Sequence, residues 1–252
     1  DIASNFNLDK KGSRLEYILE YLAEDSVERD GEEDSAAGHI GCIRLRDVSF
    51  RYPGSRDGRY AIQGFGHEFH RGGTYLIQGR SGAGKSTLMK LLYRELEQYQ
   101  GSITVNTEEL SACPGAYYGR IAVAAHDSRL FHTTIRENLL FADSAATDGM
   151  LLQACEDAQL GKDLKKLPEG LDAPVGENGS ALSGGQRQRL ILSRLFLRHA
   201  DLYILDEALD EIGIADEVEI LDRLRARNKD SIILVISHRL TQYRDAQRVL
   251  IQ

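Results

Sequence analysis

The stretch "GRSGAGKST" at residues 79–87 places glycines, a lysine and hydroxyl side chains at the spacing G-x-x-x-x-G-K-[ST]. Glycines allow backbone conformations that are closed to residues with a Cβ, so successive N–H groups can point at phosphate oxygens. The lysine can reach β and γ phosphates, and the hydroxyl that follows it can ligate Mg²⁺. We therefore predict that this stretch binds a nucleoside triphosphate through Gly79, Arg80, Ser81, Gly82, Ala83, Gly84, Lys85, Ser86 and Thr87.

Two acidic pairs follow one another in "ILDEALDEIG" at 204–213. Beside a phosphate loop, a carboxylate at the end of a strand can orient Mg²⁺, and the next one can polarise a water for in-line attack on the γ-phosphate. On this interpretation Asp206 is a Mg²⁺-binding residue and Glu207 is the catalytic carboxylate. Taken alone, the same residues also fit a charged helix without chemistry, in which Asp210 and Glu211 are further solvated positions.

Apolar runs of strand length lead into both groups. "TYLIQG" at 74–79 precedes the phosphate loop, and "KSTLMKLLYRELEQY" at 85–99 is predicted to form the helix after it. "DLYILD" at 201–206 and "SIILVIS" at 231–237 are predicted to be buried strands on either side of a charged helical stretch at 214–228. Strands alternating with helices indicate an α/β core with a parallel sheet.

The part of the chain before the phosphate loop differs in character. The stretches 39–52 and 61–70 alternate in hydrophobicity and are predicted to be strands. Upstream, a capping box and apolar residues at helical spacing predict an amphipathic helix at 14–23, and the acidic stretch 24–38 is typical of a connector. We therefore divide the chain into a linker region, 1–38, and a folded domain, 39–252.

Composition excludes some classes of protein. The 252 residues are 42% hydrophobic, enough to bury a core, and the formal net charge is -8, which does not favour binding to nucleic acid. Three widely spaced cysteines suit free thiols in a reducing compartment. No run approaches the roughly 18 to 20 apolar residues of a membrane span. Because the sequence starts at Asp1 without a signal pattern, we expect it to be a piece of a longer protein.

The stretch "ALSGGQRQRL" at 181–190 narrows the choice among phosphate-loop proteins, because it resembles the signature sequence of ABC ATPases. The hydroxyl of its serine and the start of a helix can favour a γ-phosphate. In that family two domains pair head to tail, and each signature completes the nucleotide site of the other. The resemblance thus implies that Ser183, Gly184, Gly185 and Gln186 contact the nucleotide of a partner domain.

Two further side chains match the family pattern. "FRYP" at 50–53 resembles the aromatic loop, which implies that Tyr52 stacks on adenine; Tyr60 is a weaker candidate, and a strand aromatic that faces the core is the alternative. "SHR" at 237–239 resembles the switch-histidine motif, 32 residues beyond Asp206 (238 minus 206). The resemblance implies that His238 contacts the γ-phosphate, whereas a lone histidine is more often structural.

Two positions depart from the family. His126 stands where the Q-loop glutamine would touch Mg²⁺ and the attacking water. An imidazole can still offer a nitrogen to a metal or a water, but it differs in reach and can titrate near neutral pH, so we expect altered coupling to Mg²⁺; the alternative is that His126 only fills a loop position. In an ungapped alignment, Gly213 stands where the family has an aspartate that reaches across the dimer. The stretch "DEIG" at 210–213 would then be an altered form of the loop that contacts the partner domain.

The stretches 130–139 and 175–189, the latter with Glu177, resemble the exporter form of the domain. The implied fold is a phosphate-loop NTPase core with a mainly parallel sheet, an antiparallel β subdomain, and a helical subdomain at about 127–200 that carries the signature. The implied function is ATP hydrolysis with Mg²⁺, coupled to export through a second ABC ATPase domain and transmembrane domains, at the cytoplasmic face of a membrane. The alternatives are a soluble ABC-type ATPase that acts on DNA or ribosomes, and a weakly active regulatory subunit.

Overall fold

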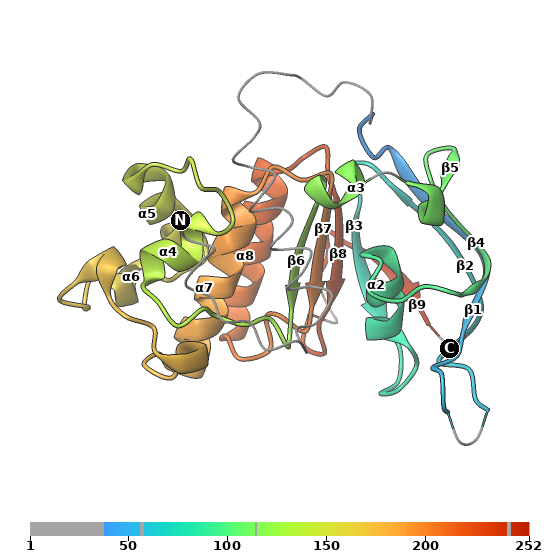
Figure 1. The fold of residues 1–252 in the computed structure, drawn as a ribbon, viewed down its shortest axis with the longest axis horizontal. Helices are drawn as coiled ribbons and strands as arrows, with labels where there is room; N and C mark the ends of the chain where they lie inside the picture. Colours follow the sequence, from blue (N-terminus) through green and yellow to red (C-terminus); the bar gives the residue numbers. More distant parts are fainter. Residues whose placement is uncertain (1–37, 56–57, 114, 241–242, 252) are drawn as a thin grey trace.

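The computed structural model describes residues 38–55, 58–113, 115–240 and 243–251, which fold in layers (Figure 1). An antiparallel sheet forms one side, a parallel sheet lies in the middle, and helices cover the other face of the parallel sheet. The helix predicted at 14–23 and the connector at 24–38, except Gly38, lie outside the described residues. No helix among the described residues has both the length and the apolar character that a bilayer crossing requires.

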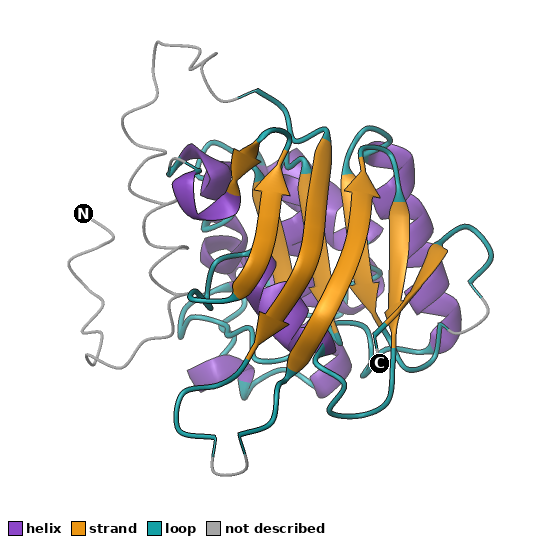
Figure 2. Cartoon of the chain, turned by 90° about the vertical axis from the view of Figure 1, so that its right-hand side faces the viewer, coloured by secondary structure: helices purple, strands orange, loops and turns teal. Residues whose placement is uncertain are grey.

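The antiparallel sheet faces the viewer in Figure 2 and confirms the strands predicted before the phosphate loop. Its order is β2 (Ile62–His70), β1 (Cys42–Phe50), β4 (Gln100–Val105) and β5 (Glu108–Glu109). In β1, Ile43 and Leu45 are buried while their neighbours Cys42 and Arg44 are only half-buried. Alternation of this kind is expected of a sheet with one packed face.

The parallel sheet has the order β6 (Ile121–Ala125), β7 (Leu202–Asp206), β8 (Ile232–Ile236), β3 (Thr74–Gln78) and β9 (Gln247–Leu250). Every residue of β7 and β8 is buried, because both faces of the sheet are covered. In β7, Leu202 and Ile204 join the core shared with the antiparallel sheet, whereas Tyr203 and Leu205 join the helical core. Since the strands are parallel, their carboxyl ends meet at one edge.

Helices pack on both faces of this sheet. Helix α2 (Lys85–Leu92) lies between the two sheets, and α7 (Gly184–Leu197) and α8 (Ile214–Arg227) cover the opposite face (Figure 1). Beyond them lie α4 (Ile135–Leu140), α5 (Asp148–Asp157) and α6 (Gly161–Leu164), within the segment proposed as the helical subdomain. The remaining helical pieces are η2 (Leu110–Ala112), α3 (Ala116–Gly119), η3 (Gly170–Asp172) and η4 (Glu177–Gly179).

The helix predicted at 85–99 is too long, because α2 ends at Leu92. Arg94 and Gln98 take left-handed φ values of 59° and 65°, and the backbone N–H of Glu95 donates to Lys90 O over 2.8 Å. A left-handed residue with such a closing bond is a common helix end. The continuation then packs Leu96 against the core below the antiparallel sheet, so tertiary packing overrides the helical pattern here.

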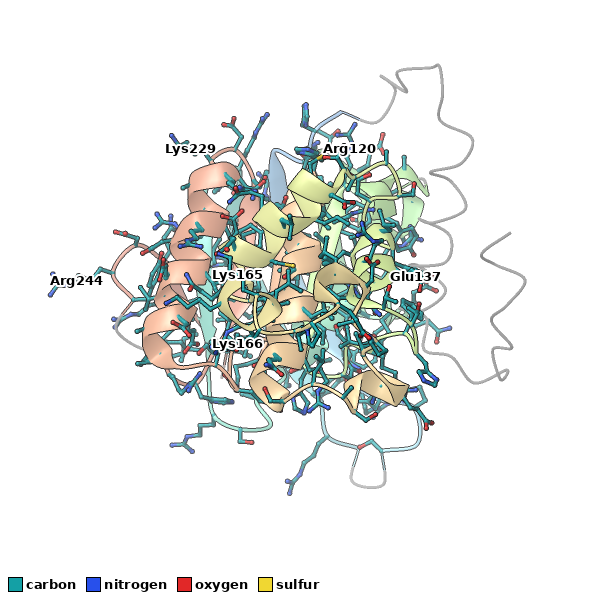
Figure 3. All side chains as sticks on the ribbon, turned by 90° about the vertical axis from the view of Figure 1, so that its left-hand side faces the viewer. Arg120, Glu137, Lys165, Lys166, Lys229 and Arg244 are labelled. Atoms are coloured by element: carbon teal, nitrogen blue, oxygen red, sulfur yellow. The ribbon has the colours of Figure 1, made fainter. Side chains whose placement is uncertain are left out.

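The opposite edge of the sheet, where the strands begin, holds the start of the described chain. Asp201 accepts a hydrogen bond from Ile40 N over 3.0 Å and pairs with Arg120 over 3.2 Å and His39 over 2.9 Å. Arg120 and Lys229 lie at this end of the molecule (Figure 3). The predicted nucleotide site therefore lies at the other edge, where the parallel strands end.

Candidate nucleotide-binding site

The phosphate loop connects β3 to α2 at the carboxyl edge of the parallel sheet. Gly82 and Gly84 adopt φ values of 78° and 90°, which L-residues with a Cβ rarely take. Lys85 is buried, and its ammonium group donates to Gly79 O and Arg80 O, both over 3.1 Å. The loop thus curls around its own lysine, and backbone N–H groups of such a curl are suited to phosphate oxygens.

Gly84→Ala should weaken ATP binding by about 10- to 100-fold, from strain of about 1 to 3 kcal/mol. The reason is that a Cβ at Gly84 would lie 2.1 Å from the backbone oxygen of Ala61, so the loop would have to move. Gly82→Ala is the matched control, because its φ of +78° brings the same backbone strain but no atom lies within 4 Å of the added Cβ. Titration with a fluorescent ATP analogue measures both, and equal affinities for the two variants would contradict this account.

Ser86 and Asp206 are brought together from positions 120 residues apart. The Ser86 hydroxyl donates to Asp206 Oδ1 over 3.0 Å. Burial raises the pKa of Asp206 to about 6, against the lowering effect of the Ser86 hydrogen bond, and the charge of Glu207 raises it further. A carboxylate and a hydroxyl are hard oxygen donors of the kind that Mg²⁺ prefers, and a bound cation would offset the cost of ionising this buried carboxyl group. The pair therefore fits the predicted metal position.

Glu207 follows β7 directly and has a left-handed φ of 55°. Its backbone N–H donates to Ile236 O at the end of β8 over 3.0 Å, which holds this conformation. The side chain then turns toward His238, whose Nε2 lies 3.0 Å from Glu207 Oε1. Unfavourable backbone conformations that are held in this way are concentrated at functional sites. The two predicted catalytic groups thus lie in direct contact.

Asp210 and Gln188 also belong to this cluster, although the sequence did not assign either to it. One ligand atom each from Glu207, Asp210 and His238 lie within 4.8 Å of one another. Burial raises the pKa of Asp210 and the neighbouring Glu207 raises it further, whereas His238, Arg239 and His126 lower it. The amide of Gln188 on α7 donates to Glu207 O over 3.4 Å and accepts from Glu211 N over 2.8 Å. The sequence offered one signal for Gln188: it is a polar residue on the apolar face of a predicted helix, where a hydrogen-bond partner is expected.

The predicted signature forms the start of α7. Ser183 caps the helix, and its hydroxyl accepts from Gln186 N over 3.3 Å while Gln186 Oε1 accepts from Ser183 N over 3.0 Å. A Cβ at Gly184 would lie 2.3 Å from Glu211 Oε2, so the glycine permits close approach to this helix start. Among the described residues, no hydrogen bond or ion pair joins positions 183–186 to the phosphate loop of the same chain.

The two tyrosines and His126 lie at the surface. Tyr52 is 42% exposed rather than core-facing, and its hydroxyl lies 3.2 Å from Thr87 Oγ1 in the phosphate-loop helix. Tyr60 is 40% exposed and lies beneath the guanidinium group of Arg51, 5.8 Å from ring centroid to Cζ. His126 is exposed, directly after β6, at the same edge of the sheet as Asp206.

Comparison with known proteins agrees with this geometry. The family model described as "ABC transporter" matches residues 62–210, from β2 through the phosphate loop and the signature to Asp210. The chain belongs to the ABC transporter family. The mixed α/β fold, with one parallel and one antiparallel sheet, is that of an ABC nucleotide-binding domain.

Proteins similar to this ABC domain include a probable multidrug resistance ABC transporter, a lipid A-core flippase and an ABC exporter. The probable multidrug resistance ABC transporter ATP-binding/permease protein YheI of Bacillus subtilis (strain 168) is 32% identical over 99% of the chain and 43% of its own length. The ATP-dependent lipid A-core flippase of Haemophilus ducreyi (strain 35000HP / ATCC 700724) is 35% identical over 84% of the chain and 36% of its own length. A bacterial Atm1-family ABC exporter solved with ATP bound matches with a TM-score of 0.79 and 28% identity, over 86% of the chain and 38% of that protein.

The chain spans less than half the length of these relatives. It is a nucleotide-binding domain of the ABC transporter family.

Proposed function

We propose that this domain binds ATP with Mg²⁺ and hydrolyses it, and that the energy drives export through a membrane part of the same transporter. The observation that supports this most directly is the meeting of two pairs at one sheet edge: Ser86 with Asp206, and Glu207 with His238, both beside the phosphate loop. The first pair suits the Mg²⁺ that accompanies bound ATP, and the second suits the activation of water, which hydrolysis needs and binding alone does not.

Each residue then has a defined task. Lys85 and the loop N–H groups neutralise the β and γ phosphates, and Tyr52 stacks on the base. Ser86 and Asp206 would hold Mg²⁺, which would supply charge neutralisation at the phosphate oxygens. Glu207 orients the attacking water through a hydrogen bond and accepts its proton. His238 holds both Glu207 and the γ-phosphate in place.

The signature completes a site in a second chain. Its helix start is separated from the phosphate loop of its own chain, and a capped helix N-terminus with flanking glycines suits an anion. Two such domains arranged head to tail would therefore form two complete sites, at the cytoplasmic face of a membrane where transmembrane domains are attached. Glu177, in the 3-10 turn η4 ahead of the signature, is placed by this proposal near those domains.

A mixing experiment tests this function and its two-chain site together. Lys85→Ala disables the phosphate loop, and Ser183→Arg disables the signature, so each variant alone should release phosphate from ATP at less than about 1% of the unmodified rate. A mixture should regain activity, because a mixed pair contains one site with both elements intact. Activity that is not restored on mixing, while the unmodified chain is active, would show that each chain works alone. An inactive unmodified chain would instead favour the regulatory subunit.

His126→Gln tests the altered Q-loop. The amide differs from the imidazole in reach, so the substitution should reduce the Mg²⁺ concentration needed for half-maximal ATP hydrolysis. Phosphate release across a range of Mg²⁺ concentrations measures this. His132→Gln, an exposed histidine outside the site, is the control. If both variants retain the Mg²⁺ dependence of the unmodified chain, His126 only fills a loop position.

A further inference from the structure

Three side chains with metal-binding atoms meet on the outer face of the antiparallel sheet, away from the nucleotide-binding edge. Cys42 of β1 lies directly opposite His70 of β2, and Glu68 is two positions before His70 on the same strand. Ile43 and Phe69, the residues that separate these positions, are fully buried. Because side chains alternate along a strand, Cys42, Glu68 and His70 all project from the outer face, which Figure 2 presents.

The distances bring one atom of each side chain into range of a single ion. The Cys42 sulfur, a carboxylate oxygen of Glu68 and a ring nitrogen of His70 lie within 4.8 Å of one another. The two carboxylate oxygens of Glu68 have different partners. Oε2 lies 3.5 Å from His70 Nε2, and Oε1 accepts a hydrogen bond from Arg44 Nε over 2.5 Å. One oxygen therefore faces the cluster while Arg44 fixes the orientation of the carboxylate, as hydrogen-bonded partners of metal ligands commonly do.

The backbone beneath the cluster is held from both sides. Asn106 Oδ1 accepts from the N–H groups of Gly41 and Cys42, over 2.8 and 3.1 Å, and Asn106 N donates to Cys42 O over 2.7 Å. Arg71 N donates to Gly41 O over 2.9 Å on the opposite strand. A site on rigid strands needs little reordering to take up an ion.

We propose that Cys42, Glu68 and His70 form a zinc-binding site. Sulfur, imidazole nitrogen and a carboxylate oxygen are the three protein ligand types of Zn²⁺, and a thiolate selects it over Mg²⁺ and Ca²⁺. Three protein ligands leave the fourth tetrahedral position to water. The ion would join β1 to β2 across their register and so clamp the edge of the antiparallel sheet.

A reactive thiol is the competing assignment for Cys42. Burial raises the pKa of this thiol, and the neighbouring Glu68 raises it further. Without an ion this disfavours a nucleophilic cysteine, which requires a lowered pKa in positive surroundings. A zinc ligand must be a thiolate as well, and the charge of a bound Zn²⁺ would itself lower the pKa of Cys42. The metal assignment is also independent of ATP hydrolysis, since none of the three side chains belongs to the nucleotide site.

Cobalt substitution provides the test. The nucleotide-free chain, freed of metal by chelator, is titrated with Co²⁺ while absorbance is recorded, and Zn²⁺ is then added in competition. The expected result is one Co²⁺ per chain, with a thiolate-to-cobalt charge-transfer band and visible bands of a tetrahedral ion, all removed by one equivalent of Zn²⁺. Absence of the charge-transfer band at saturating Co²⁺ would overturn the proposal.

Variants assign the ligands. Cys42→Ser should remove the charge-transfer band, and His70→Ala should weaken Zn²⁺ binding by at least about tenfold. The matched controls are Cys113→Ser, at the other half-exposed cysteine, and His132→Ala, at an exposed histidine. Circular dichroism and thermal melts show that each variant is folded. A band that persists in Cys42→Ser, or unchanged Zn²⁺ affinity in both folded site variants, would place the ion elsewhere and refute the assignment.

Discussion

Glu207→Gln should lower the rate of ATP hydrolysis by about 100- to 10,000-fold, the range that a positioned acid or base contributes. The amide cannot accept a proton from the attacking water, yet it has nearly the same shape and keeps the hydrogen-bond geometry with His238, 3.0 Å away. ATP binding should therefore be preserved, and a dimer that cannot turn over its nucleotide should accumulate. Phosphate release measures the first effect, and light scattering with ATP and Mg²⁺ measures the second.

Glu219→Gln is the control for this variant, since Glu219 is an exposed acid on α8 that pairs with Arg223 outside the site. Turnover of Glu207→Gln within about tenfold of the control would remove Glu207 from the role of catalytic carboxylate. Loss of ATP binding in Glu207→Gln would indicate instead that the left-handed turn at residue 207 had been disturbed.

Asp206→Asn should stabilise the nucleotide-free and Mg²⁺-free chain at pH 7.5 by as much as about 3 kcal/mol. The pKa of Asp206 is raised from 3.8 to about 6 by burial. Between these values the folded chain binds more protons than the unfolded chain, so the free energy of unfolding falls as pH rises from about 4 to 6. The difference, about 2 pH units at about 1.4 kcal/mol each, gives the expected gain. Asparagine carries no charge and keeps an oxygen that can accept from Ser86.

Urea unfolding between about pH 4 and 8 checks this expectation, because the difference between Asp206→Asn and the unmodified chain should disappear near pH 4. Asp230→Asn, at a carboxylate that is 84% exposed, should show no such window. With Mg²⁺ and ATP present the order should reverse, since the asparagine would hold the metal less well. An equal or lower stability of Asp206→Asn in the metal-free chain would mean that the buried carboxylate does not destabilise the fold.

The sequence predicted those parts of the site that follow from local pattern. Glycines between a buried strand and a helix specify a phosphate loop, and Asp206 is the last residue of β7, at the edge where parallel strands end together. The contact between Glu207 and His238 was not predicted, since the family resemblance implied only that His238 contacts the γ-phosphate. Its geometry depends on the left-handed turn at residue 207 and on a backbone bond to β8, neither of which has a local signal.

Other features depend on long-range packing and could not be read from the chain. Helix α2 ends at Leu92 because the residues after it pack below the antiparallel sheet, although their composition suits a helix. Asp210 was assigned to a dimer contact, yet it lies within 4.8 Å of the two catalytic side chains, because the turn after Glu207 folds back on itself. The cluster of Cys42, Glu68 and His70 forms only when β1 pairs with β2 in the observed register, and that register has no local signal in the sequence.

The side-chain amide of Gln188 links both ends of the 207–211 turn to α7, the helix that begins with the signature. In the head-to-tail pair proposed above, the start of that helix would contact the nucleotide of the other chain. Gln188 would therefore couple the catalytic turn of one site to nucleotide binding at the other.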